Sequence, residues 1–320
     1  MLNLEIGSVF NPASPMAEAT LRLLYLLAVL GAGVLLLISA IVVGSAIRFR
    51  DRGRPSPTTG ERRGAEIFWI LGAALLLAVI LVSTVRTMRV VDPPAGDGTP
   101  DLLITGHQFW WEARYPSSGV VAANEIHIPV GRPLLLRVES ADVVHDFWVT
   151  QLTRKIDATP GHPVMIWLQA DVPGVYLGTC GRFCGVEHAW MRIRVVAESP
   201  ADFAAWQQAQ SRTPAPPTGK DAIAGQRLYD RLACGQCHAS TVAVGPDLNH
   251  LASRETLAAG VISNTPDNLA RALRPLLGDT PERAKQLEAF GKLDTIMTTG
   301  RVPSINAADI VLATMRKGRR

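Results

Sequence analysis

Four side chains that bind soft metal ions lie within twelve residues of this sequence, in the segment CGRFCGVEHAWM. They are two thiols, an imidazole and a thioether: Cys180, Cys184, His188 and Met191. Such donors favour copper over magnesium or calcium. A mononuclear blue copper site needs two His, one Cys and a weak axial Met. The second thiol therefore suggests two copper ions that share both sulfurs.

A further ligand is needed from elsewhere in the chain, and the best candidate is His145. It follows a strand-like run, in the segment SADVVHDFWV. A cupredoxin-like sandwich brings the end of such a strand beside a late loop. Packing alone could explain Met191 or Trp190, but it does not explain the whole cluster.

A second motif, Cys234-Gly-Gln-Cys237-His238, has the spacing of a c-type haem attachment site. Cys234 and Cys237 would form thioethers to the haem vinyl groups, and His238 would be the proximal iron ligand. A helix-like run precedes the motif, and Gly245-Pro-Asp-Leu resembles the loop that braces the proximal His in cytochromes c. The two motifs use all four cysteines. A disulfide framework is the alternative for an exported region, but both pairs have ligand spacing and neighbouring histidines.

A cytochrome c needs a distal Met well downstream of its attachment motif. Met297 fits best, because it lies in a predicted loop before Ser304, a suitable N-cap for a last helix. Met315 falls inside that helix, where packing is the simpler role. His250 is a weaker rival for the iron. His107, His127 and His162 lie in strand-like runs or a turn and are interpreted as structural or exposed.

Two apolar runs, residues 21–47 and 67–85, are long enough to cross a membrane. A hydrocarbon core of about 30 Å needs roughly 20 helical residues. The loop between the runs carries six arginines against Asp51 and Glu61, so we expect it in the cytoplasm. Both ends of the chain then lie on the outer face. Glu5 and Glu18, in place of a basic leader, favour a retained anchor over a cleaved signal peptide.

The rest of the chain predicts three further parts. Between residues 93 and 200, short apolar or alternating runs bounded by Gly, Pro and Asp indicate an all-β sandwich. Residues 201–219 begin as a helix and become a Pro-rich linker. Residues 220–320 read as an all-α cytochrome c domain, and residues 1–92 hold the N-terminal segment and the helical hairpin. The net charge of +4, without a basic patch interleaved with aromatics, indicates no nucleic-acid partner.

Beyond the ligands, the sequence resembles the dinuclear copper (CuA) domain of cytochrome c oxidase subunit II over about residues 10–200. The resemblance rests on the following segments: GHQFWWE at 106–112, ANEIHIPVG at 123–131, KIDATPG at 155–161 and PGVYLGTC at 173–180. It implies that Cys180 and Cys184 bridge two coppers. His145, His188 and Met191 would complete the pair, and the backbone carbonyl of Arg182 would be the remaining weak donor.

Three positions depart from the family pattern. Arg182 stands where the family has a Glu that helps to hold magnesium at the interface with subunit I, so no magnesium is expected. Phe109 stands where the family has the Trp that receives electrons from cytochrome c, and Trp110 and Trp111 could replace it. Thr150 stands where the family has Pro, which we interpret as neutral.

The resemblance implies subunit II of a bacterial haem–copper cytochrome c oxidase with a fused cytochrome c domain. Electrons from cytochrome c or the fused haem c would pass through the copper pair to subunit I, where oxygen is reduced and protons are translocated. The expected partners are subunits I and III, a cytochrome c donor and membrane lipid. Among redox proteins, a subunit of a nitric oxide reductase is the alternative. A nitrous oxide reductase fits less well, because it carries its copper domain last in a long soluble chain. A quinol oxidase subunit would share the fold but lack the cysteines. An anchored copper-delivery protein is the alternative from another class, but it explains neither Met191, His188 nor the haem motif.

Overall fold

The computed structural model describes residues 7–50, 63–92, 98–238 and 245–277, with residues 280, 281, 284, 285 and 288. The chain divides into two compact units, Met1–Ile262 and Ser263–Arg320. The first unit contains the helical hairpin, the β-sandwich and the Cys-x-x-Cys-His motif.

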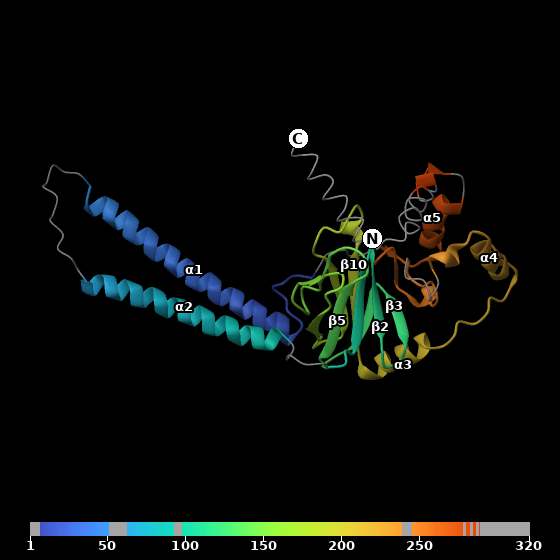
Figure 1. Ribbon diagram of the computed structural model, residues 1–320, viewed down its shortest axis with the longest axis horizontal. Helices are drawn as coiled ribbons and strands as arrows, with labels where there is room; N and C mark the ends of the chain where they lie inside the picture. Colours follow the sequence, from blue (N-terminus) through green and yellow to red (C-terminus); the bar gives the residue numbers. More distant parts are fainter. Residues whose placement is uncertain are drawn as a thin grey trace. The chain divides into compact units, whose positions relative to one another are not determined.

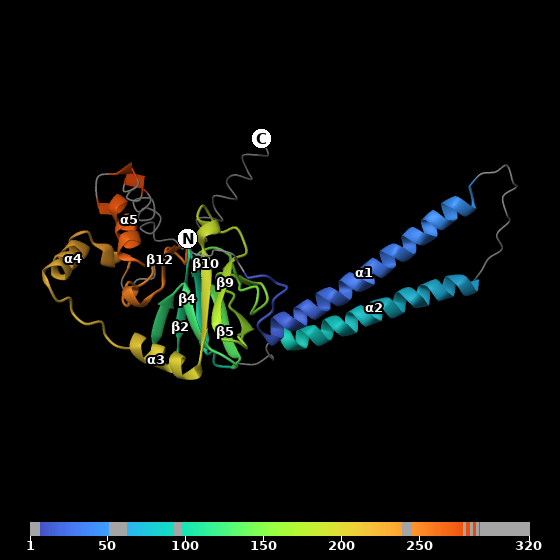
Figure 2. The ribbon, with the colours of Figure 1, turned by 180° about the vertical axis from the view of Figure 1, so that it is seen from behind.

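Two long apolar helices begin the described structure, α1 (Pro15–Arg48) and α2 (Arg63–Val91). They lie side by side (Figures 1 and 2). Both are long and apolar enough to cross a membrane, and none of their most apolar stretch is buried within the protein. The Ser14 side chain caps α1 by accepting a hydrogen bond from the Ala17 N–H at 3.0 Å. The two expected spans are thus present in length and composition, while the arginine-rich loop lies outside the described residues.

Two five-stranded sheets form the sandwich expected from the alternating runs. One sheet has the strand order β3-β2-β1-β5-β8, and the other has the order β4-β10-β9-β6-β7. The first comprises β1 (Leu102–His107), β2 (Trp110–Tyr115), β3 (Val120–Ala123), β5 (Leu134–Ser140) and β8 (Val164–Leu168). The second comprises β4 (Glu125–Pro129), β6 (His145–Trp148), β7 (Ile156–Ala158), β9 (Gly174–Cys180) and β10 (Arg192–Glu198).

The core lies between the two sheets and follows the period of two that a half-buried strand requires. In β10, Ile193 and Val195 are buried while Arg192 and Arg194 alternate with them. The aromatic side chains Trp111 and Phe147 are fully buried and meet edge to face with ring centroids 5.4 Å apart. This packed interior gives the strand ends at one edge a fixed position.

The segment before α1 is hydrogen-bonded to the loop that follows β6. Ala13 N–H donates to the Gln151 carbonyl at 2.9 Å, and the Ser14 hydroxyl donates to the Leu152 carbonyl at 2.6 Å. The Thr150 hydroxyl donates to the Gly7 carbonyl. A proline at position 150 could not make this last bond, so Thr150 has a specific contact here.

Helix α3 (Pro200–Gln210) covers part of the sandwich. Ser199 caps it, and its Phe203 and Trp206 pack against the hydrophobic core. The Trp206 ring stacks on His127, with centroids 4.1 Å apart. The first half of the segment predicted as a linker is therefore a helix packed on the sandwich.

The remaining described elements of the first unit are short: α4 (Lys220–Arg231), the 3-10 turns η2 (Cys234–Gln236) and η3 (Leu251–Ser253), and β11 (Thr256–Leu257), which pairs with β12 (Ile262–Ser263). The second unit contributes α5 (Pro266–Leu277). Met297, Ser304 and Met315 lie outside the described residues. The pairing of β11 with β12 shows that residues 220–320 are not all-α as expected, and a cytochrome c fold for this region stays a prediction.

Candidate metal centre

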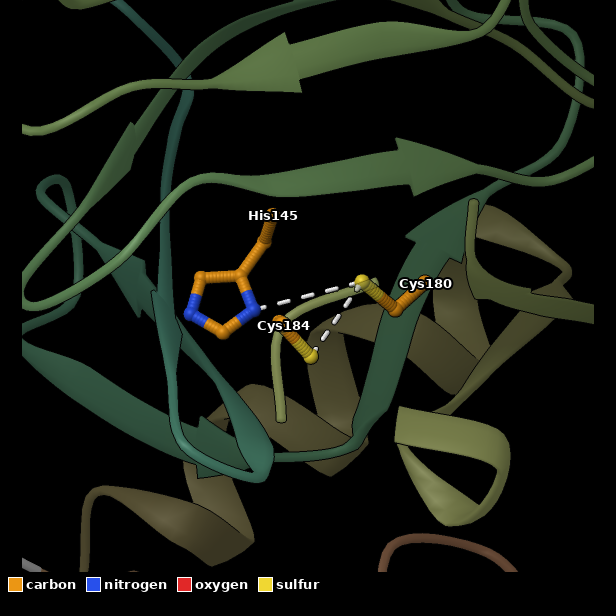
Figure 3. Close-up of side chains that lie close together, drawn as sticks. All are labelled: His145, Cys180 and Cys184. Atoms are coloured by element: carbon orange, nitrogen blue, oxygen red, sulfur yellow. Dashed lines mark hydrogen bonds between the residues drawn. The ribbon is translucent and has the colours of Figure 1, made fainter. Parts of the chain in front are cut away.

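Two neighbouring strands of one sheet carry the first two candidate ligands, His145 and Cys180. His145 begins β6 and Cys180 ends β9, and these strands pair antiparallel with Phe147 opposite Cys180. The loop between β9 and β10 then supplies Cys184 and His188. Met191 immediately precedes β10, and β10 returns beside β9. Strand pairing fixes both ends of the loop, and Figure 3 shows the side chains of Cys180 and Cys184 close together beside the ring of His145.

The structure brings all the sequence-predicted sulfur and nitrogen donors together. The Sγ atoms of Cys180 and Cys184 are 3.9 Å apart. His145 Nδ1 lies 3.9 Å from Cys180 Sγ, and His188 Nδ1 lies 3.6 Å from Cys184 Sγ. The ligating atoms of His145, Cys180 and Cys184 all lie within 4.8 Å of one another, and all three residues are buried.

Two weak donors complete the cluster. The Arg182 carbonyl oxygen is 3.2 Å from Cys180 Sγ, and Met191 Sδ is 3.8 Å from Cys184 Sγ. Each sulfur of the pair thus has one imidazole and one weak donor beside it. The sulfur–sulfur distance of 3.9 Å is shorter than twice a metal–thiolate bond of roughly 2.3 Å. A metal ion bonded to one thiolate can therefore reach the other, so the residues fit a shared copper site.

Asp142 fixes the orientation of His145. Its Oδ1 accepts a hydrogen bond from His145 Nε2 at 2.7 Å, which turns Nδ1 toward Cys180. Burial alone would lower the pKa of His145, but the Asp142 carboxylate and the Cys180 sulfur outweigh it and raise this pKa to about 9. A carboxylate behind a histidine is the usual arrangement that orients a metal ligand.

The two thiols differ in acidity in the metal-free protein. Burial would raise the pKa of Cys180, but hydrogen bonds from its surroundings, with His145 first, hold it below its ordinary value. Burial and the neighbouring Cys180 raise the pKa of Cys184 to about 12. Cys180 is thus the more acidic of the two thiols, and the charge of a metal ion would favour loss of the proton from Cys184.

The side chain of Arg182 is directed to an acidic residue and not to a cation site. Its guanidinium pairs with Asp157 at 2.9 Å. A guanidinium donates hydrogen bonds and has no lone pair for a metal. The residues here therefore do not fit the interface magnesium of the family, while the carbonyl of Arg182 keeps its place beside Cys180.

The aromatic segment after β1 lies against this centre. Trp111 is fully buried, with its ring centroid 5.8 Å from that of His145. Trp110 is 7% exposed and stacks on His107. Phe109 is partly exposed, and a side-chain carbon at Gly185 would come within 2.8 Å of its ring. Phe109 therefore lies directly beside the ligand loop.

Two residues with direct contacts to the ligand set were missed by sequence reasoning. Asp142 supports His145, and the signal was its spacing of three residues before a candidate ligand. Gln108 donates its Nε2–H to the Cys184 carbonyl, and its backbone N–H donates to Asp142 at 2.6 Å. Nothing local in the sequence indicates the contact between Gln108 and Cys184, because 76 residues separate them.

The Cys-x-x-Cys-His motif forms a compact turn elsewhere in the first unit. Cys234 and Cys237 are free thiols of intermediate burial, and the His238 N–H donates to the Cys234 carbonyl at 3.0 Å. His238 Nδ1–H donates to the Pro246 carbonyl at 2.9 Å. Because a carbonyl oxygen can only accept, this bond requires a proton on Nδ1, and Nε2 takes no part in it. A side-chain carbon at Gly245 would meet the His238 ring at 2.8 Å, so the loop passes closely over it.

A thiol pair with two imidazoles and a thioether, at one edge of a two-sheet sandwich behind two apolar helices, defines an anchored cupredoxin-type copper protein. Residues 117–198 match the family model for the cytochrome c oxidase subunit II periplasmic domain. Cytochrome c oxidase subunit 2 of Alkalihalophilus pseudofirmus is 35% identical over 217 residues, which are 65% of this chain and 63% of that protein. A probable cytochrome c oxidase subunit 2 of Rickettsia bellii is 27% identical, over 64% of this chain and 84% of that protein.

A crystal structure of the periplasmic domain of cytochrome oxidase subunit II from Bradyrhizobium japonicum is 30% identical, with a TM-score of 0.34, and covers 35% of this chain and 95% of that one. The chain spans just under two thirds of its Alkalihalophilus relative. Residues 117–198 thus match the subunit II periplasmic domain, and 65% of the chain is similar to a subunit 2 of cytochrome c oxidase. His145, Cys180, Cys184 and Met191 are the chain's CuA-type copper site residues.

Proposed function

We propose that this chain is the membrane-anchored subunit that accepts electrons for a haem–copper oxidase and passes them through a dinuclear copper centre. The observation that carries the proposal is the pair of buried sulfurs 3.9 Å apart, each with an imidazole nitrogen within 3.9 Å. A single-copper site would need only one of these thiolates. The second is explained if both sulfurs bridge two ions.

The chain's own residues give this centre its electronic and steric properties. When bound, the copper pair supplies a one-electron redox couple. Cys180 and Cys184 would hold both ions, and His145, His188, Met191 and the Arg182 carbonyl would complete the donor set. Burial of the thiols excludes water, and Asp142 binds the N–H of His145 Nε2, so that Nδ1 is the nitrogen directed to the metal. A rigid set of donors allows electron transfer with little movement of the ligands.

The surface around the ligand loop supports assembly with partner subunits. Three of its apolar side chains are exposed: Phe183 at 77%, Val186 at 89% and Trp190 at 50%. Grouped exposed apolar residues mark a protein interaction site. We infer that oxidase subunit I takes electrons here, with subunit III in the same complex, and that oxygen reduction and proton translocation occur outside this chain.

The membrane topology follows from charge. With the arginine-rich loop in the cytoplasm of a bacterial cell, both helices return the chain to the outer face of the inner membrane. The copper domain and the residues after it then lie in the periplasm, where a cytochrome c donor is available.

We further propose that Cys234 and Cys237 attach one haem c covalently and that His238 is its proximal iron ligand. The support is the Nδ1 contact of His238 with Pro246, which frees Nε2 for the iron. Met297 is the proposed distal ligand. The haem would accept electrons from an external cytochrome c and give them to the copper pair.

Electron paramagnetic resonance on the full chain in detergent, loaded with copper, tests the first proposal. We expect hyperfine structure from one electron shared by two equivalent copper nuclei. A single-copper spectrum, or copper lost to a mild chelator, would favour a delivery protein. A shared-electron spectrum in a complex that reduces nitric oxide and not oxygen would favour a nitric oxide reductase.

Haem attachment has an independent test. Denaturing gel electrophoresis with a haem stain should show haem that stays with the wild-type chain and is absent from Cys234→Ser. Loss of the stain from wild type on denaturation would contradict covalent attachment.

A further inference from the structure

Glu125, the first residue of β4, is buried at 4% exposure and binds a segment far along the chain. Its Oε1 accepts a hydrogen bond from the Thr256 N–H at 2.7 Å and another from the Thr256 hydroxyl. Its Oε2 accepts from the Glu255 N–H at 3.1 Å. Thr256 is equally buried at 4%. One carboxylate thus receives three hydrogen bonds from two consecutive residues, and bonds to a charged acceptor are the stronger kind.

Neighbouring elements of the copper domain bind the same segment. The Arg194 guanidinium, on β10, pairs with the Glu255 carboxylate. The Gln210 side chain, at the end of α3, donates to the Ser253 hydroxyl at 2.9 Å. Residues 253–256 therefore contact two strands and one helix of the sandwich.

Glu125 is connected to the proposed copper ligands through its neighbour in the sequence. Asn124 precedes it, and the Asn124 Oδ1 accepts a hydrogen bond from the Trp111 N–H at 2.9 Å. The Trp111 ring lies 5.8 Å from the ring of His145. β4 also pairs in parallel with β10, which begins directly after Met191, and Glu125 lies opposite Arg194 near that end.

The residues just before this segment contact the Cys-x-x-Cys-His motif. His238 is hydrogen-bonded to the Pro246 carbonyl, and Asp247 follows at once. The Arg254 side chain donates to the Asp247 carbonyl and to the Asn249 carbonyl at 3.4 Å. These bonds close residues 247–254 into a compact loop between His238 and the Glu125 contact.

We propose that residues 247–257 are a docking segment that fixes the haem-bearing region to the copper domain at Glu125. The electron donor is then docked at a defined position and not merely held near by a flexible linker. In the step that this geometry serves, ferrous haem loses one electron and the oxidised copper pair gains it, and no proton or bond is exchanged. Glu125 and Thr256 act as positioning residues. The redox part of this proposal rests on the proposed haem and copper centres.

The test uses the full chain with a site-specific protease sequence inserted in the exposed linker, within residues 212–218. After cleavage, size-exclusion chromatography shows whether the C-terminal fragment stays with the copper domain. In uncleaved protein, flash photoreduction of the haem gives the rate of electron transfer to copper. The variants are Glu125→Ala, which removes the acceptor, and Glu255→Arg, which reverses the charge facing Arg194. Glu139→Ala, on β5 of the other sheet, is the matched control.

We expect wild type and Glu139→Ala to retain the fragment and to transfer electrons fast. Glu125→Ala and Glu255→Arg should release the fragment and slow the transfer at least tenfold, with an unchanged copper spectrum. Glu255→Arg keeps the sandwich sequence intact, so it remains decisive if Glu125→Ala fails to fold. Release of the wild-type fragment, or retention with an unchanged rate in Glu255→Arg, would overturn the docking proposal. Absence of covalent haem would contradict the haem proposal alone, because the retention assay does not depend on haem.

Discussion

The two cysteine motifs of this chain are held in different ways. The proposed copper ligands lie on two paired strands and on the loop held between β9 and β10, and Cys180, Met191 and His145 are at most 2% exposed. The Cys-x-x-Cys-His motif lies on the short turn η2 between α4 and a loop, and neither thiol is buried. Within the described residues, its histidine is oriented by one side-chain hydrogen bond, to Pro246.

This difference indicates how far each site is folded before its cofactor binds. The sandwich can close without metal because its core is formed by apolar side chains from both sheets. Copper then binds to donors already in place. The haem region lacks such a core among its described residues, so we expect the cofactor itself to supply much of the apolar contact there, as structural metals do in small domains.

Replacing each cysteine pair tests whether the region around it folds without its cofactor. These variants should have the largest effects on cofactor binding and stability. We expect Cys180→Ser with Cys184→Ser to abolish copper binding while the free energy of unfolding of the metal-free sandwich falls by only about 1–2 kcal/mol. Cys234→Ser with Cys237→Ser should remove haem and increase the rate of proteolysis after residue 219 at least tenfold. Metal analysis, chemical denaturation and timed proteolysis measure these outcomes. Equal protease resistance in the second variant and in wild type would remove the contrast.

Asp142→Asn tests whether the carboxylate that orients His145 contributes to copper binding. An amide supports the Nδ1 donor of His145 less well than a carboxylate does, so we expect copper affinity to fall by about 10- to 100-fold. Competition with a chelator of known affinity measures it. Asp171→Asn is the control, since Asp171 lies on an exposed loop, and it should leave the affinity unchanged. An unchanged affinity in Asp142→Asn would remove Asp142 from the ligand-orienting role.

Asp146 makes the metal-free sandwich sensitive to pH. It is 1% exposed, and its Oδ1 has no hydrogen-bond partner among the described residues. Burial raises the pKa of Asp146 to about 7, although Lys155 opposes this. Because the folded state holds the proton more tightly than the unfolded state, the stabilisation is full below about pH 4 and is lost as pH rises toward 7. We expect Asp146→Asn to remove about 1–2 kcal/mol of this pH dependence. Denaturation curves at several pH values, with copper absent, measure it, and identical curves for the two proteins would contradict it.

Arg182→Ala should have the smallest effect on the copper centre. The donor at this position is the backbone carbonyl, 3.2 Å from Cys180 Sγ, and the side chain pairs outward with Asp157. Copper stoichiometry and the paramagnetic resonance spectrum should match wild type. Loss of one copper would mean that the Arg182–Asp157 pair is needed to hold the carbonyl in place.

The sequence was most informative where a pattern is local. The alternation in β10 and the apolar runs of α1 and α2 predicted their structures, since burial imposes the period directly. The clustering of Cys180, Cys184, His188 and Met191 required only that one loop fold back on itself.

Long-range contacts could not be predicted from the sequence, because no periodicity encodes them. Glu125 and Thr256 are 131 residues apart, and neither has a pattern that indicates the other. The helix at the start of residues 201–219 was predicted, but its packing was not, because Phe203 and Trp206 contact a core that both sheets must first form. Met297 lies outside the described residues, so the distal haem ligand stays a prediction.

The hydrogen bonds from Ala13 and Ser14 to the loop after β6 have a consequence for biogenesis. On the proposed topology, residues 7–14 reach the outer face only after the segment ahead of the first span has been translocated. The copper domain, however, is synthesised after both spans. Its last contacts therefore form between a segment exported early and a loop exported late. We expect correct insertion of the hairpin to precede completion of the copper domain, and hence copper loading.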